Sequence, residues 1–130
     1  MHAKSFRLAV VCVVSLALPS WAHHSHGNYD TTQWTPFQGT VKEVHWLNPH
    51  SWIYIDIKDD KDQVTTWALE AASPRQIQDK GVKRDDVRPG DLIKVRCHVL
   101  RDGTNGCLLG FVTPLHGDPA RGHGIEREWD

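Results

Sequence analysis

Residues 51–58 read Ser-Trp-Ile-Tyr-Ile-Asp-Ile-Lys, and the alternation in this stretch decides the fold class. Side chains point to opposite faces of a β-strand in turn, so the three isoleucines share one face while Trp52 and Tyr54 share the other. The isoleucine face predicts a strand that packs on a hydrophobic core. The charged turn at 59–62 and the β-prone run at 64–70 predict that a second strand follows in a hairpin.

A strand is also expected before this hairpin. Residues 35–46 are β-prone, and Val41 and Val44 stand three apart, which breaks the two-residue period and indicates a bulge. The Asn-Pro pair at 48–49 predicts the turn that joins this strand to the next.

Downstream, the sequence predicts one short helix and a second hairpin. Residues 73–81 begin with Ser-Pro and end with Gly, as a capped helix does. The alternating runs 92–100 and 107–113 are separated by Asp-Gly and Asn-Gly, which favour a hairpin loop. Alternate residues of the last strand are expected to share the core face: Cys107, Leu109 and Phe111.

The order of these elements predicts a mainly β fold, a small five-stranded OB-like barrel with one short helix between strands 3 and 4. An SH3-like barrel and a small α+β sheet are the alternatives. The chain then divides into a signal peptide (1–22), a His-rich N-terminal arm (23–33), the OB-like barrel domain (34–114) and a flexible C-terminal tail (115–130).

The first 22 residues have the pattern of a secretory signal. Lys4 and Arg7 precede an apolar run at 8–18, and small residues lead up to Ala22. We expect cleavage after Ala22 and a periplasmic or secreted product. The apolar run is too short to cross a bilayer at about 1.5 Å per helical residue, so no permanent membrane anchor is expected.

The charge balance argues against nucleic acid as a partner. The 130-residue chain has a formal net charge of −1, and the expected cleavage removes Lys4 and Arg7 but no acidic residue. The mature protein would be mildly acidic, whereas nucleic-acid binders carry a basic surface.

Two cysteines remain after the expected loss of Cys12, and they are Cys97 and Cys107. Both fall on the apolar faces of strands joined by one hairpin. An even pair in an exported protein predicts a disulfide, and two buried thiols are the alternative.

Five short stretches carry a resemblance to a known family: His-His-Ser at 23–25, Asn-Pro-His-Ser at 48–51, Trp-Ala-Leu-Glu at 67–70, Arg-Pro-Gly-Asp at 88–91 and Arg-Asp-Gly-Thr at 101–104. The chain resembles a family of small exported bacterial proteins known only as a domain of unknown function. The resemblance implies an exported single domain with a small β-barrel, and it implies no activity, substrate or cofactor.

Histidines gather in two places and predict a transition-metal site, with copper first and zinc second. The amino-terminal brace, in which His23 supplies its α-amine and ring Nδ1, would chelate copper, while Ser25 at mature position three speaks against a square-planar peptide-amide site. Glu70 and His98 are weaker candidates. Structural roles in a tail and a turn are the alternative for each histidine alone. The proposed ligands are His23, His24, His26, His45 and His50.

Aromatic residues suggest a second class of function, a metal-free binding module. Trp46, Trp52 and Tyr54 would form a surface for a small ligand, a glycan or a protein partner, unless a terminal segment covers it. The carboxylates of Asp56 and Glu70 lie on neighbouring predicted strands, but no catalytic motif accompanies them. The sequence therefore predicts neither an enzyme nor an organic cofactor.

Overall fold

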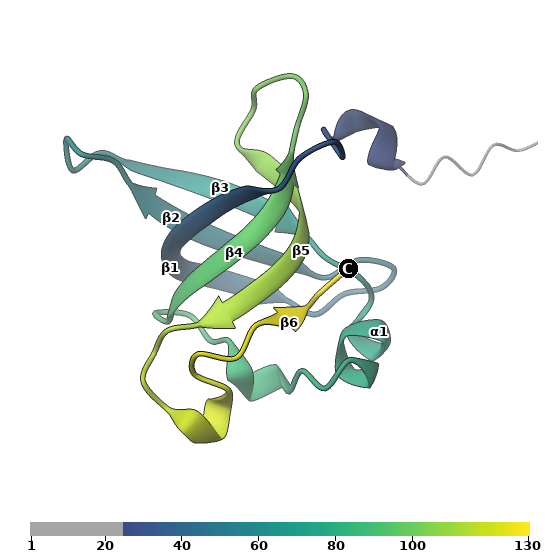
Figure 1. Ribbon diagram of the computed structural model, residues 1–130, viewed down its shortest axis with the longest axis vertical. Helices are drawn as coiled ribbons and strands as arrows, with labels where there is room; N and C mark the ends of the chain where they lie inside the picture. Colours follow the sequence, from purple (N-terminus) through teal and green to yellow (C-terminus); the bar gives the residue numbers. More distant parts are fainter. Residues whose placement is uncertain (1–24) are drawn as a thin grey trace, which may run out of the picture.

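The computed structural model describes residues 25–130, so the expected signal peptide, His23 and His24 lie outside it. Six strands and one α-helix make up the fold (Figure 1). The strands are β1 (Thr35–His45), β2 (Trp52–Lys58), β3 (Val64–Glu70), β4 (Leu92–Val99), β5 (Gly106–Pro114) and β6 (Arg127–Glu128). The helices are α1 (Pro74–Asp79) and the 3-10 turns η1 (Ser25–Asn28), η2 (Arg84–Asp86) and η3 (Pro119–Arg121).

The strands follow the order β3-β2-β1-β4-β5-β6, and a parallel pairing of β3 with β5 closes the first five into a barrel. All other pairs of neighbouring strands are antiparallel. The helix α1 lies between β3 and β4 in the chain, as the sequence predicts. The mainly β, OB-like fold class is thus confirmed, with β6 as one extra strand.

The long strand β1 belongs to two parts of the barrel. Its first half pairs with β4 and its second half with β2, and the register shifts between Val41 and Glu43, which confirms the predicted bulge. Gly39 lies where the two halves meet. A Cβ atom there would come within 2.7 Å of the Asp56 carbonyl oxygen, so the close approach of the strands requires glycine.

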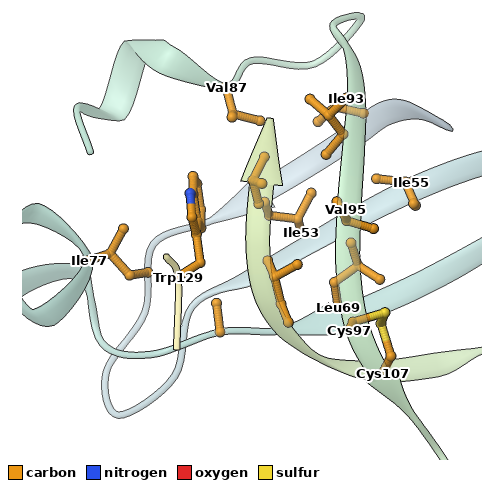
Figure 2. Packing of buried hydrophobic residues seen from close by; sticks show 14 of the residues in the cluster. Ile53, Ile55, Leu69, Ile77, Val87, Ile93, Val95, Cys97, Cys107 and Trp129 are labelled. Atoms are coloured by element: carbon orange, nitrogen blue, oxygen red, sulfur yellow. A yellow bond between two sulfur atoms is a disulfide. The ribbon is translucent and has the colours of Figure 1, made fainter. Parts of the chain in front are cut away.

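The barrel interior is filled mainly by residues that the alternation assigned to it. Ile53 and Ile55 are fully buried and pack in one cluster with Leu69 and with residues of β4 and β5 (Figure 2). The Sγ atoms of Cys97 and Cys107 lie at disulfide distance, 2.16 Å apart, within this core. The predicted pairing of the two cysteines is therefore confirmed.

The expectation that Phe111 lies on the core face of its strand is wrong. In the pairing of β4 with β5, Arg96 opposes Phe111 and Cys97 opposes Leu109, so Gly110 is an extra residue in β5. This bulge moves Phe111 to the outer surface, where the Arg96 guanidinium lies 4.1 Å from its ring centroid. Val112 takes the buried position in its place.

Residues 115–130, expected to form a flexible tail, pack against the barrel in the structure. The strand β6 pairs with Phe111 and Val112 of β5, and Trp129 is only 1% exposed. Figure 2 shows Trp129 between Ile77 of α1 and the barrel strands. A large indole thus covers the end of the barrel where α1 lies.

The helix α1 has the predicted start. The Ser73 side chain accepts a hydrogen bond from the Gln76 N–H, and the Gln76 side chain accepts from the Ser73 N–H, which forms a capping box. Within residues 25–130, no helix is long and apolar enough to cross a membrane.

Candidate functional site

A surface hollow of about 250 Å³ brings together segments that are far apart in the chain. It is formed by η1, the β1–β2 loop, the start of α1, β5 and the last residue, which lie on one side of the barrel (Figure 1). The residues that line it are His26, Pro49, His50, Ala72, Gln76, Leu108 and Asp130. Two of the five histidines proposed as metal ligands therefore share one concave surface.

The β1–β2 loop holds His50 in place through its backbone. The Asn48–Pro49 peptide is cis. The Ser51 N–H donates to the Ala72 carbonyl at 3.0 Å, and the Ala71 N–H donates to the Ser51 carbonyl at 2.9 Å. Because this loop is tied to the segment that enters α1, His50 is presented from a fixed position.

The N-terminal arm, residues 25–33, is fixed along the end of β4 and the β4–β5 loop. The Arg101 N–H donates to the Asn28 carbonyl at 2.9 Å, and the Asp30 N–H donates to the Val99 carbonyl at 2.8 Å. The Arg101 guanidinium also donates to the Tyr29 carbonyl at 3.1 Å. These bonds bring His26 to the rim of the hollow.

A buried carboxylate lies beside His50. The Glu70 side chain is 8% exposed, and its Oε2 accepts a hydrogen bond from the Tyr29 hydroxyl at 2.5 Å. Burial, followed by the hydrogen bond and the charge of Glu70, raises the pKa of Tyr29 well above its usual value. Tyr29 therefore remains a hydrogen-bond donor to Glu70 throughout the physiological pH range.

Two acceptors lie close to one ring nitrogen of His50. Its Nδ1 lies 3.4 Å from Oε1 of Glu70 and 3.3 Å from the carbonyl oxygen of Ala71. Both neighbours are acceptors, so this geometry suits the tautomer that has its proton on Nδ1. In that tautomer Nε2 is the nitrogen whose lone pair can ligate a metal.

His45 is placed elsewhere. Its Nε2 lies 2.8 Å from Oε2 of Glu43, its ring centroid lies 5.3 Å from that of Tyr54, and it does not line the hollow. His23 and His24 are outside the described residues. Among residues 25–130, no three His, Cys, Asp or Glu side chains are close enough to hold a metal ion between them.

The weaker candidate His98 also lies apart from the hollow. Its ring stacks on Trp34 with centroids 3.8 Å apart, and its Nδ1 lies 2.7 Å from the Gln33 carbonyl oxygen.

The sequence did not point to Tyr29 or Asp130 as residues of this region. A tyrosine inside the polar arm is a weak signal, and nothing local marks Asp130.

The three aromatic candidates divide into two groups. Trp52 and Tyr54 lie near each other on the outer face of β2, with centroids 6.5 Å apart. Trp46 instead packs against Trp129 at 5.3 Å and beneath the guanidinium of Arg84. Only Trp52 and Tyr54 can therefore form one aromatic surface.

The fold and the hollow define a class: a small closed β-barrel whose N-terminal arm and first loop present histidines to one side. More particularly, the chain belongs to a family of unknown function (DUF6152), whose model matches residues 9–109. This confirms the resemblance found in the sequence. No curated protein and no solved structure matches the chain.

Proposed function

We propose that the protein is an exported, periplasmic metal-binding domain that holds one Cu(II) or Zn(II) ion in the hollow between the arm and the β1–β2 loop. One observation carries this proposal: His26 and His50, from separate segments, line the same hollow. Nitrogen-rich ligand sets suit both metals. Metal binding, without a catalytic step, is the function that we assign.

Two histidines are too few for a stable site, so the arm must supply more. His23 and His24 directly precede η1, and at about 3.6 Å per extended residue their chain length reaches the hollow that His26 lines. If the signal is cleaved after Ala22, the α-amine of His23 is a further nitrogen donor. Because no third ligand from residues 25–130 completes the set, the nitrogens of the preceding arm residues are the ones this proposal requires.

Two features support export. The first 22 residues carry the charged, apolar and small-residue regions of a secretory signal. The Cys97–Cys107 pair lies at disulfide distance, and disulfides persist in oxidising compartments such as the periplasm.

The test is isothermal titration of residues 23–130, with a native and untagged His23, against Cu(II) and Zn(II). We expect stoichiometric binding with a sub-micromolar Kd, sharply weakened in a form lacking residues 23–26 and in His50→Ala. His45→Ala is the matched control, because His45 contacts Glu43 and does not line the hollow. The metal affinity of this variant should equal that of the wild type. Weak binding of similar strength in all four proteins would refute the proposal.

A second candidate function uses the aromatic surface of β2. Trp52 and Tyr54 are half-buried on its outer face, and the strand 2–3 face is a common ligand site in OB-folds. A small ligand, glycan or protein bound there would be lost in Trp52→Ala and Tyr54→Ala, while metal affinity would be unchanged. Retention of such a ligand by both variants would exclude this surface.

A further inference from the structure

The two oxygens of Glu70 contact the two segments that carry the described histidines of the hollow. Oε2 accepts from Tyr29 of the arm, and Oε1 lies beside His50 of the β1–β2 loop. We propose that Glu70 is a positioning residue that holds His50 as the Nδ1–H tautomer, and that Tyr29 couples docking of the arm to metal binding. This inference rests on the proposed function and adds its regulation.

The location of Glu70 shows why the arm is required. In the strand pairings Glu70 opposes Trp52 and Leu108, so it lies on the outer face of the barrel, where a carboxylate is usually solvated. It is nevertheless buried, with Tyr29 hydrogen-bonded to it. A buried carboxylate is costly unless donors satisfy it, so loss of the Tyr29 hydroxyl would favour release of the arm and hydration of Glu70.

The contact with His50 has the arrangement found around metal-binding histidines. Such a histidine donates its second ring N–H to a carboxylate or a carbonyl oxygen, which fixes the tautomer and the ring orientation. In this protein Nδ1 faces both kinds of acceptor, Glu70 and Ala71. Nε2 is thereby the ring nitrogen left for a metal.

The same contacts make the coupling reciprocal. Because the arm carries both Tyr29 and His26, a metal that binds His26 and His50 must stabilise the docked arm, and a docked arm must raise metal affinity. The amide protons of Asp30 and Arg101, which donate to Val99 and Asn28, report on docking. Their hydrogen exchange should slow when Zn(II) is added.

The experiment compares Glu70→Gln and Tyr29→Phe with Glu43→Gln in residues 23–130. The matched control is Glu43→Gln. The Glu43 carboxylate also contacts a histidine, at 2.8 Å from His45 Nε2, but both side chains of this pair are exposed. Imidazole 15N shifts of the metal-free proteins at pH 8 report the His50 tautomer. Zn(II) titration then gives the affinities, and circular dichroism verifies the fold.

For Glu70→Gln we expect a mixed His50 tautomer and Zn(II) affinity lowered by about 10–100-fold. For Tyr29→Phe we expect the wild-type tautomer, faster exchange at Asp30 and Arg101, and weaker Zn(II) binding. Glu43→Gln should behave as the wild type.

The inference is overturned if wild-type His50 is the Nε2–H tautomer, or if both Glu70→Gln and Tyr29→Phe match Glu43→Gln in every readout. If the wild type binds no Zn(II), the proposed function fails, while the tautomer and exchange data of the metal-free proteins still decide the roles of Glu70 and Tyr29. If Glu70→Gln does not fold, Tyr29→Phe decides the coupling and the wild-type shifts decide the tautomer.

Discussion

The indole of Trp129 packs against the indole of Trp46, with ring centroids 5.3 Å apart. The backbone N–H of Trp129 donates to the Gly110 carbonyl at 2.8 Å. The backbone carbonyl of Trp129 accepts from the Ala72 N–H, also at 2.8 Å. The C-terminal segment is thus tied to the bulge of β5 and to the residues that lead into α1. Trp129 is one of the largest side chains of the core, although it stands next to the end of the sequence.

Replacing Trp129 with alanine should lower the free energy of unfolding by about 3–5 kcal/mol, because it empties a large volume in the core. Urea denaturation followed by circular dichroism measures this loss. Trp34→Ala is the control, since Trp34 is 43% exposed and its removal should cost much less. Equal losses in the two variants would contradict the assigned role of Trp129.

Removing the Cys97–Cys107 link should also destabilise the fold. The two residues are 10 apart in sequence, and closing a loop of that size in the unfolded chain corresponds to about 3 kcal/mol. The measurement is the urea midpoint of the double variant Cys97→Ala/Cys107→Ala against the wild type, with and without reductant. The variant should be insensitive to reductant, and an unchanged midpoint in both comparisons would show that the link adds no stability.

Ser51→Ala should leave stability unchanged or raise it by about 1 kcal/mol. The Ser51 hydroxyl is buried and has no hydrogen-bond partner within residues 25–130. Removing an unsatisfied hydroxyl relieves its desolvation cost while the backbone hydrogen bonds of the loop remain. A clear loss of stability in thermal unfolding would mean that the hydroxyl makes a favourable interaction.

Alkaline pH should lower the free energy of unfolding, because Tyr29 loses its proton. Its folded-state pKa is raised, so the stability that it contributes is fully present below its unfolded pKa of about 10 and is lost as pH rises above that value. Unfolding free energies between pH 8 and 11 should fall more steeply for the wild type than for Tyr29→Phe. Parallel pH profiles of the two proteins would be inconsistent with the buried Tyr29–Glu70 hydrogen bond.

Much of the barrel could be predicted from local patterns. The alternation around Ile53 gives β2 and its core face, and Val41 and Val44 give the bulge of β1. Ser73 and Pro74 mark the start of α1. Each of these signals lies within a few residues of the element it describes, so no long-range information is needed.

The predictions from the sequence that proved wrong concern features that depend on residues far apart in the chain. Alternation placed Phe111 in the core, but the bulge at Gly110 reverses the faces, and Trp34 packs directly over that glycine. Residues 115–130 contain few apolar residues, so the sequence does not show that Trp129 fills the end of the barrel.

The candidate site was predicted only in part. The sequence names His26 and His50, which line one hollow, but it also includes His45, which lies beside Glu43. Glu70 was a weaker candidate, and Tyr29, its buried partner, stands 41 residues away in the sequence. A contact across that distance depends on the closed barrel and cannot be found from local spacing.

The hollow is lined by His26 at one end of the described chain and by Asp130 at the other. A purification tag attached before His23 or after Asp130 would therefore bring foreign side chains close to the candidate site. A polyhistidine tag would add competing ligands where copper or zinc is to be measured. The choice of expression vector thus decides whether a titration reports on this protein or on its tag.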